Sequence, residues 1–226
     1  MFCSSHQGIT PETVKCDSVT IKASLRYYIV ERELEVELVS RLRAGDSTAF
    51  DEIYIVFNRR LLNFLARLAR NRSVAEDLLE ETWLRLVSAG EDLRPDTRLG
   101  PWLFTVARNL YVSYCRSRVR ETAYTADLVF LWPVEMPKTP FDLASLSEFE
   151  ERLEAAIADL PPIYREVILL VGVQQLRPVD AAEVCGISPE SLRQRLKRAR
   201  DSLSRFLAKQ DSAETPGEEV TRVTRG

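Results

Sequence analysis

The chain has a single histidine, His6, and it lacks the glycine-rich loops that cradle phosphates. Neither G-x-x-x-x-G-K-[ST] nor G-x-G-x-x-G occurs among its 8 glycines. Histidine is the side chain used most often for proton transfer in catalysis, and such loops are typical of nucleotide-cofactor sites. We therefore predict that the protein is not an enzyme and that it carries no cofactor.

Long hydrophobic runs are also missing. The longest apolar stretch, residues 167–173, contains a glycine and is far shorter than the roughly 20 residues that cross a bilayer. The N-terminus has no basic start followed by an apolar segment and a small-residue cleavage site, which a secretory signal would have. These absences predict a soluble, cytoplasmic protein without membrane insertion.

Cysteine is scarce, and its 4 occurrences are scattered along the chain. In a reducing compartment Cys3, Cys16, Cys115 and Cys185 are most simply free thiols. Cys3, His6 and Cys16 are candidate zinc ligands, but three ligands at irregular spacing are weak evidence. The sequence favours a disordered tail there, and no metal site is predicted.

Charge is nearly balanced in total but uneven along the chain. Taken alone, the net charge of −3 argues against a nucleic-acid partner. However, residues 98–120 carry five arginines and no acid, and residues 190–209 carry seven basic side chains against two acids. Residues 121–160 hold nine acids against two bases. Because local fields matter more than the sum, two basic blocks separated by an acidic connector remain compatible with DNA binding.

Apolar residues recur at helical spacing in nearly every periodic segment, and no stretch shows the sustained alternation of a strand. We predict an all-α protein with two small helical domains. Pro133, Pro137 and Pro140 interrupt the pattern and indicate a linker. The expected divisions are a disordered N-terminal extension at 1–28, a first domain at 29–120, a linker at 121–147, a second domain at 148–209 and a disordered tail at 210–226.

An acidic helix is expected in the first domain. The run 73–76, Ser-Val-Ala-Glu, is a capping box and predicts that a helix begins there. One face of this helix is apolar and is expected to be buried, with Leu78, Leu79, Thr82, Trp83, Leu86 and Val87. The opposite face presents mainly acids, with Asp77, Glu80, Glu81, Leu84 and Arg85.

A loop at 91–100 and a basic helix opened by Pro101 follow. The loop offers the polar side chains Arg94, Asp96, Thr97 and Arg98. The inward face of the helix is predicted to carry Trp102, Leu103, Val106, Ala107, Leu110 and Tyr114. Its outward face is predicted to carry Thr105, Arg108, Asn109, Val112, Ser113 and Arg116.

The end of the second domain has the pattern of a helix-turn-helix. Ala182 lets two helices approach closely, Gly186 supplies a positive φ, and Ser188 with Pro189 predicts the start of a new helix. Its inward side is expected to carry Leu192, Leu196, Ala199 and Leu203. Its outward side carries the groups that phosphates and guanine edges attract, with Arg193, Gln194, Lys197, Arg198 and Arg200.

Five motifs in this order give the chain a specific likeness. They are RLRAGD with AF at 41–50, AEDLLEETWL at 75–84, WLFTVARN at 102–109, LPP with YREV at 160–167, and RLKRAR at 195–200. Together they resemble a bacterial RNA polymerase sigma factor of the extracytoplasmic-function (ECF) group, in the sigma-70 family. The likeness spans about 37–120 and 148–207.

The resemblance implies partners and contact residues. It implies binding to core RNA polymerase, with the acidic helix on the β′ clamp helices and residues 163–173 near the β-flap, and it implies an anti-sigma factor as a further partner. The polymerase contact would use Asp77, Glu80, Glu81 and Leu84. The promoter −10 element would be met by Arg94, Asp96, Thr97, Arg98, Thr105, Arg108, Asn109, Val112, Ser113 and Arg116. The −35 element would be met by Ser188, Glu190, Ser191, Arg193, Gln194, Arg195, Lys197, Arg198 and Arg200.

The function implied is promoter-specific initiation of transcription, in which the protein also helps to melt DNA. The main alternative is a helix-turn-helix repressor or activator that acts without being a polymerase subunit. That alternative gives no reason for an acidic helix, a loop and a basic helix within one small domain. An interaction adaptor that has lost DNA binding is a third possibility, against which the intact basic blocks speak.

Overall fold

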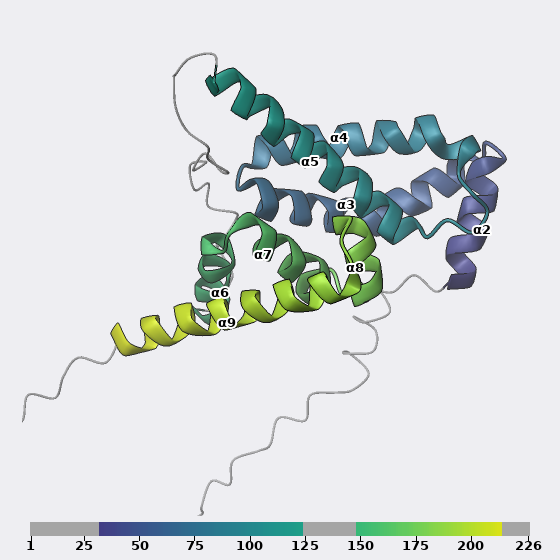
Figure 1. Ribbon diagram of the computed structural model, residues 1–226. Helices are drawn as coiled ribbons and strands as arrows, with labels where there is room; N and C mark the ends of the chain where they lie inside the picture. Colours follow the sequence, from purple (N-terminus) through teal and green to yellow (C-terminus); the bar gives the residue numbers. More distant parts are fainter. Residues whose placement is uncertain (1–31, 124–147, 214–226) are drawn as a thin grey trace, which may run out of the picture.

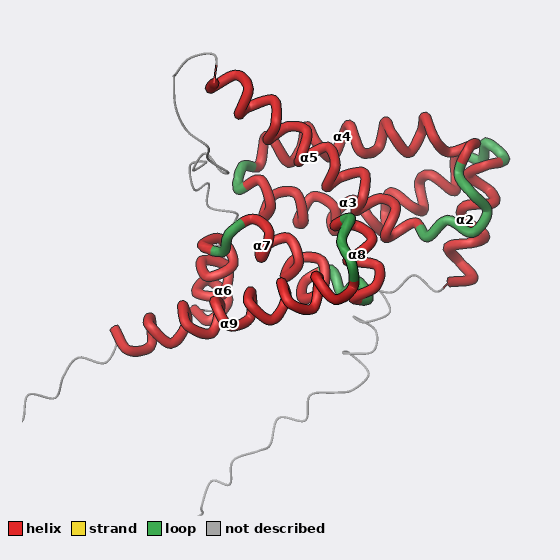
Figure 2. The backbone as a smooth tube through the Cα atoms, viewed as in Figure 1, coloured by secondary structure: helices red, strands yellow, loops and turns green. Residues whose placement is uncertain are grey.

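The computed structural model describes residues 32–123 and 148–213. These residues form helices and connecting turns, and no strand occurs among them (Figures 1 and 2). The predicted all-α fold with two helical domains is confirmed. The first domain contains α2 (Arg32–Arg43), α3 (Ser47–Ala69), α4 (Arg72–Ala89), a 3-10 turn (Gly90–Asp92) and α5 (Leu99–Ala123). The second contains α6 (Glu148–Asp159), α7 (Pro162–Ile168), a π-helical turn (Leu169–Val173), α8 (Pro178–Cys185) and α9 (Pro189–Ala213).

Several expectations lie outside the described residues. They concern the N-terminal extension with Cys3, His6 and Cys16, most of the linker, and most of the C-terminal tail. Helices α5 and α9 continue to Ala123 and Ala213, a few residues past the ends predicted for the two domains. Within the described part of the chain, no helix is both long and apolar enough to cross a membrane.

Aromatic side chains hold the first domain together. Phe64 of α3 and Phe104 of α5 are fully buried and meet edge to face, with ring centroids 5.3 Å apart. Trp83 of α4 packs edge-on against Phe50 of α3 at 5.8 Å. Its indole N–H donates a hydrogen bond of 3.1 Å to Asn58 Oδ1. Edge-to-face ring pairs contribute about 0.5–1.5 kcal/mol beyond their buried area, so these contacts fix α4 and α5 against α3.

The start of α4 differs from the predicted capping box. Asn71, and not Ser73, is the N-cap, and its Oδ1 accepts a hydrogen bond of 3.1 Å from the backbone N–H of Val74. Glu76 pairs with the guanidinium of Arg72 at 2.8 Å, and Ser73 lies inside the helix. The prediction of the helix was right and that of its cap was wrong. Asparagine is as good an N-cap as serine, so the earlier residue can start the helix.

The buried faces also differ in detail. Val87 is predicted to be buried, yet it is 62% exposed and shares the outer face of α4 with Leu84 one turn earlier. Phe104 and Tyr111 are buried although the predicted inward face of the basic helix omits them. The reason is that α5 packs against α3 and α4 and also against α8 of the second domain. A pattern with a single buried face does not anticipate this.

A buried arginine organises the second domain. The side chain of Arg165, on α7, is 4% exposed and donates to the carbonyl oxygens of Ala158 at 2.7 Å and Leu160 at 2.9 Å. These carbonyls lie at the C-terminal end of α6, where backbone acceptors lack helical partners. The same guanidinium also reaches the carbonyl of Leu68 on α3 at 3.4 Å. Arg165 therefore closes the turn between α6 and α7 and touches the first domain.

The two domains pack directly on each other. Helix α8 lies against α5, and α7 with the π-helical turn lies against α3, while α4 is on the side of the first domain away from α6 to α9 (Figure 1). Arg67 of α3 pairs with Glu154 of α6 at 2.7 Å. Arg60 of α3 donates to the backbone carbonyl of Gln174 at 2.9 Å. Polar contacts along α3 thus join the two domains in addition to the packing of α8 on α5.

Candidate nucleic-acid interface

The turn before α9 has the geometry that its sequence predicts. Gly186 ends α8 in the left-handed conformation, with φ 64°, which glycine adopts without a steric penalty. The backbone N–H of Ser191 donates to Ser188 Oγ at 3.1 Å, so Ser188 caps the helix that Pro189 opens. Leu192, like Leu196 and Ala199, is buried, which fixes the rotation of α9 about its axis.

This rotation turns a basic face of α9 to the outside. The side chains predicted to point outward are all exposed, namely Arg193, Gln194, Lys197, Arg198 and Arg200. Arg193 forms an exposed ion pair with Glu190 at 2.7 Å, which also lowers the pKa of Glu190. Arg195 differs from its neighbours, because it is half-buried and lines a cleft of about 270 Å³ between the domains.

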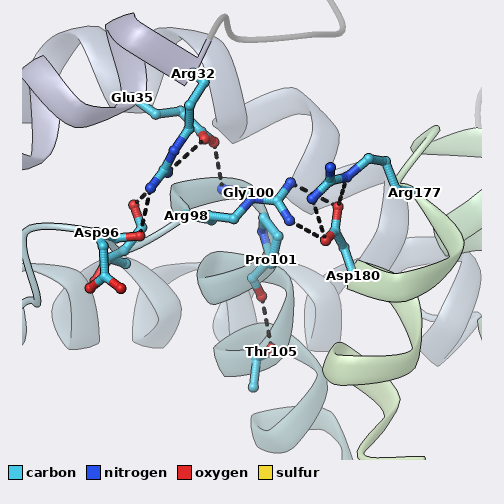
Figure 3. A network of polar contacts seen from close by, with 10 residues as sticks. Arg32, Glu35, Asp96, Arg98, Gly100, Pro101, Thr105, Arg177 and Asp180 are labelled. Carbon is cyan, nitrogen blue, oxygen red and sulfur yellow. Dashed lines mark hydrogen bonds and ion pairs between the residues drawn. The ribbon is translucent and has the colours of Figure 1, made fainter. Parts of the chain in front are cut away.

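The predicted −10 loop is held from behind by α2 (Figure 3). The guanidinium of Arg32 donates to the carbonyl oxygens of Asp96 at 2.8 Å and Thr97 at 3.3 Å. Glu35 is only 7% exposed and accepts from the backbone N–H of Gly100 at 3.3 Å. A carboxylate at this position satisfies a free N–H in the first turn of α5 and matches the positive end of the helix dipole.

The side chains at the tip of the loop are exposed, whereas Arg98, its last polar residue, is bound to the second domain. Arg94 and Asp96 are exposed and pair with each other at 3.0 Å. Arg98 instead crosses to the second domain and makes a two-pronged ion pair with Asp180 of α8, one bond of which measures 2.8 Å (Figure 3). Arg177 binds the same carboxylate at 2.9 Å. Asp180 therefore lies between two guanidinium groups and is 2% exposed.

The outward face of α5 is divided in the same way. Asn109, Ser113 and Arg116 are exposed. Arg108 forms an ion pair through its Nε with the buried carboxylate of Glu166 on α7. The remaining expected positions are partly buried: the Thr105 hydroxyl donates to the carbonyl of Pro101 at 2.7 Å, and Val112 lines the same interdomain cleft as Arg108 and Arg195.

The outer face of α4 combines acids with apolar side chains. Asp77 and Glu80 are exposed, while Glu81 is partly buried and pairs with Arg85 at 2.7 Å. Beside them Leu84 is 60% exposed. Leu84 and Val87 form an apolar strip next to the acids, toward the C-terminal end of the helix.

Comparisons with known proteins assign both domains. Residues 54–121 match the family model described as Sigma-70 region 2, and residues 150–203 match Sigma-70, region 4. The chain is 37% identical over 144 residues to the ECF RNA polymerase sigma factor EcfG of Rhodopseudomonas palustris, covering 64% of this chain and 77% of that protein. It is 31% identical over 156 residues to the ECF factor SigM of Bacillus subtilis, covering 68% of this chain and 91% of that one. The chain is an ECF sigma factor of the sigma-70 family.

Solved structures agree with this assignment. The sigma factor RpoE of Bartonella quintana, in complex with the anti-sigma factor NepR, is 29% identical to this sigma factor. It superposes with a TM-score of 0.59 over 70% of this chain and 96% of that chain. CnrH, in complex with the cytosolic domain of CnrY, is 21% identical. It shares the fold with a TM-score of 0.58 over 80% of this chain and 99% of that one. The alternative of a free-standing repressor or activator is not favoured.

The sigma factor uses residues that the motifs did not identify. Arg32 and Glu35 position the loop at 93–99 although they precede the family-like region, and their only sequence signal is charge on an otherwise half-apolar helix. Asp180 and Glu166 were not singled out as contact residues either. Each is an acid within a helix of the second domain, and nothing in the sequence indicates that its partner is an arginine of the other domain.

Burial and pairing set the protonation of groups between the domains. Burial works to raise the pKa of Asp180, but hydrogen bonds from Arg98 and Arg177 outweigh it, and the net shift is downward. The carboxylate is thus ionised at neutral pH. Burial, with the nearby Glu166, raises the pKa of the Cys185 thiol to about 12, so that thiol is neutral. Burial also lowers the pKa of Arg165 to about 10, which still leaves it charged.

Proposed function

We propose that this sigma factor reads the −35 element with α9, binds the opened −10 element with the loop at 93–99 and the outer face of α5, and binds core polymerase with the outer face of α4. The single observation that carries the proposal is the exposed basic face of α9, fixed in rotation by the buried side of the helix and by the capped turn before it. Phosphates and base edges in a major groove attract these side chains.

In the −35 contact, the side chains on α9 have two roles. Arg193, Gln194 and Lys197 face base edges, and Arg198 with Arg200 hold phosphates. A bidentate base contact discriminates by about 1–3 kcal/mol at one base pair, whereas a phosphate contact adds affinity for any sequence. The exposed Glu190–Arg193 pair is a weak competitor, because exposed ion pairs contribute only about 0–1 kcal/mol.

In the −10 contact, the loop tip and the exposed residues of α5 hold a strand that has left the duplex. Opening the duplex costs unstacking energy, so the protein must offer a polar pocket and a basic surface for the freed strand. Arg94, Asp96 and Thr97 supply the pocket, Asn109 meets a base edge, and Arg116 meets the backbone. Arg98 and Arg108 complete this surface once they leave their carboxylate partners.

The polymerase contact uses the acids of α4 together with its apolar strip. Asp77, Glu80 and Glu81 offer charge to the clamp helices of the β′ subunit, and Leu84 with Val87 offers area that water would otherwise cover. The face lies on the side of the first domain away from α6 to α9, because α4 packs mainly on α3 and α5. The protein acts as a non-catalytic initiation factor, and an anti-sigma factor is a further partner, as in the complex of RpoE with NepR.

Reconstituted transcription tests this proposal. Purified core polymerase with the full chain should initiate at specific promoters selected from a library. The double substitution Asp77→Arg and Glu81→Arg should abolish core binding and leave the circular dichroism spectrum unchanged, since neither side chain is buried. The charge-matched control, Glu148→Arg with Glu151→Arg on the exposed side of α6, should keep core binding. Normal core binding by the α4 variant would show that this helix is not the interface.

A further inference from the structure

Helix α2 binds the backbone of the loop before α5 at two places (Figure 3). The guanidinium of Arg32 donates to the carbonyl oxygens of Asp96 at 2.8 Å and of Thr97 at 3.3 Å. Glu35 Oε1 accepts from the backbone N–H of Gly100 at 3.3 Å. The side chains of Arg32 and Glu35 also pair with each other at 3.5 Å. Together these two residues form a clamp, the α2 clamp, that ties the loop to the first turn of α5.

The Glu35 contact meets a need that the start of α5 creates. Pro101 has no N–H to donate, and the N–H of Trp102 already donates to the carbonyl of Arg98 at 3.0 Å. The backbone of Gly100 is buried, and an unpaired N–H in a buried position is costly. By accepting from this N–H, the Glu35 carboxylate fixes where α5 begins relative to α2.

The contacts within the loop are local and do not place it on the domain. The N–H of Thr97 donates to the carbonyl of Arg94 at 2.9 Å, and the side chain of Arg94 pairs with Asp96 at 3.0 Å. These bonds join residues two or three positions apart, so they shape the turn alone. Arg32, in contrast, is 64 positions from Asp96. The placement of the loop tip on the first domain therefore depends on α2.

The α2 clamp holds the loop without using its polar side chains. Arg32 binds only backbone carbonyls of the loop. The side chains of Arg94 and Asp96 are exposed, whereas Leu93 and Leu99 at the two ends of the loop are buried. A binding site on a loop is precise only where other groups lock the loop in place. The clamp supplies that lock and leaves the polar side chains available for a ligand.

We propose that Arg32 and Glu35 are positioning residues for promoter recognition, which determine how strictly the loop before α5 selects a base of the −10 element. This inference rests on the proposed function of that loop. The two residues act through the backbone, because a shift of the carbonyls of Asp96 and Thr97 also moves the side chains that surround the base. Both precede residues 54–121, which match Sigma-70 region 2. Base selection in this sigma factor thus depends on a helix outside the matched region.

The test uses holoenzyme reconstituted from core polymerase and the full chain, on promoters that differ only at single −10 positions. The clamp variant combines Arg32→Met with Glu35→Leu, which removes the donors and the acceptor. We expect discrimination among the −10 sequences to fall by about tenfold, the scale of one base contact. Affinity for core polymerase and for a −35 duplex should not change. The control, Arg43→Met with Glu33→Leu, removes the same charges from exposed positions of α2 and should leave the discrimination intact.

A conservative variant separates positioning from general support of the fold. Glu35→Gln keeps an oxygen that can accept from Gly100, so it should retain the discrimination that Glu35→Leu loses. Equal losses in the two variants would contradict the role of this hydrogen bond. Thermal unfolding is measured for every variant, because a merely structural role would lower initiation from all promoters alike and leave their ratio unchanged. If Glu35→Leu folds poorly, Arg32→Met alone carries the test, since the Arg32 side chain is 47% exposed.

A direct loop variant, Asp96→Ala with Thr97→Ala, locates the −10 position that the loop reads. The clamp variant should lose preference at the same position. If the loop variant alters the preference and the clamp variant does not, Arg32 and Glu35 only support the fold, and this inference fails while the proposed function of the loop stands. If neither variant alters the preference, the loop does not read the −10 element, and its proposed function fails as well.

Discussion

The two basic helices of this sigma factor, α5 and α9, carry similar side chains in opposite circumstances. On α9 the arginines of the proposed DNA face are exposed, and Arg193 pairs with the exposed Glu190. At α5, Arg98 and Arg108 are bound to buried carboxylates of the other domain. The difference shows that the sequence reveals which basic side chains are present, whereas the fold decides which of them are exposed and able to bind DNA.

Neighbouring acids explain the difference in physical terms. An exposed pair such as Arg193 with Glu190 contributes about 0–1 kcal/mol and is easily replaced by phosphate. A buried carboxylate that accepts two-pronged bonds holds its arginine by charge-assisted hydrogen bonds, which are roughly twice as strong as neutral ones. The α9 face is therefore ready to bind, whereas the α5 face is complete only after the domains separate.

The largest expected effect comes from truncating a buried side chain that fixes the exposed basic face of α9. Leu192 is fully buried on the inner side of α9. Leu192→Ala should lower the free energy of unfolding by about 2–5 kcal/mol, as cavity-forming substitutions do. Binding to a −35 duplex should fall with it. Chemical denaturation and duplex titration measure both effects. Leu203→Ala, at a partly buried position on the same helix, is the control and should cost less. Equal losses for the two variants would argue against Leu192 as the anchor of this face.

A second, intermediate effect separates the two roles on α9. Arg193→Ala should relax preference at one or two upstream base pairs, by about 1–3 kcal/mol in discrimination. Arg198→Ala should weaken all sequences alike and lower the slope of log affinity against log salt by about one. Titrations of several −35 sequences at several salt concentrations measure both. If Arg193→Ala lowers affinity equally for every sequence, α9 does not read bases through that residue.

The smallest expected effect is the response to pH of the ion pairs that Asp180 makes between the two domains. Because the folded pKa of Asp180 lies below its ordinary value, its ion pairs with Arg98 and Arg177 contribute stability above the ordinary range of an aspartate. That contribution is lost as pH falls through the lowered pKa. Below pH of about 4, the ordinary value, the radius of gyration should begin to increase. Asp180→Asn should reduce this part of the response, and an unchanged acid response in that variant would assign the effect to other carboxyl groups.

Much of the architecture follows from the sequence, because it depends on local signals. Gly186 and Ser188 specify the turn before α9 within a few residues, and the spacing of Leu192 and Leu196 specifies which side is buried. Local signals do not specify the start of α4, because Asn71 and Ser73 are both competent caps and only the packed structure selects Asn71.

The ion pairs and buried residues that the sequence did not predict depend on contacts between segments far apart in the chain. The partner of Arg98 is 82 positions away, and the partner of Arg108 is 58 positions away. Nothing local distinguishes Arg108 from the exposed Arg116 on the same helix. The burial of Phe104 and Tyr111 likewise follows from α5 being covered on more than one side. Periodicity describes one helix at a time and cannot reveal a second domain folded over it.

The most direct measurement is the reactivity of single arginines in the free protein. An arginine-selective dicarbonyl reagent, followed by peptide mass spectrometry, reports how available each guanidinium is. We predict fast modification of Arg198 and Arg200 and slow modification of Arg98 and Arg108, with the latter two becoming fast in the variant that combines Asp180→Asn and Glu166→Gln. If Arg98 and Arg108 react as quickly as Arg198 in the unaltered protein, the two DNA faces do not differ in availability and the account is contradicted.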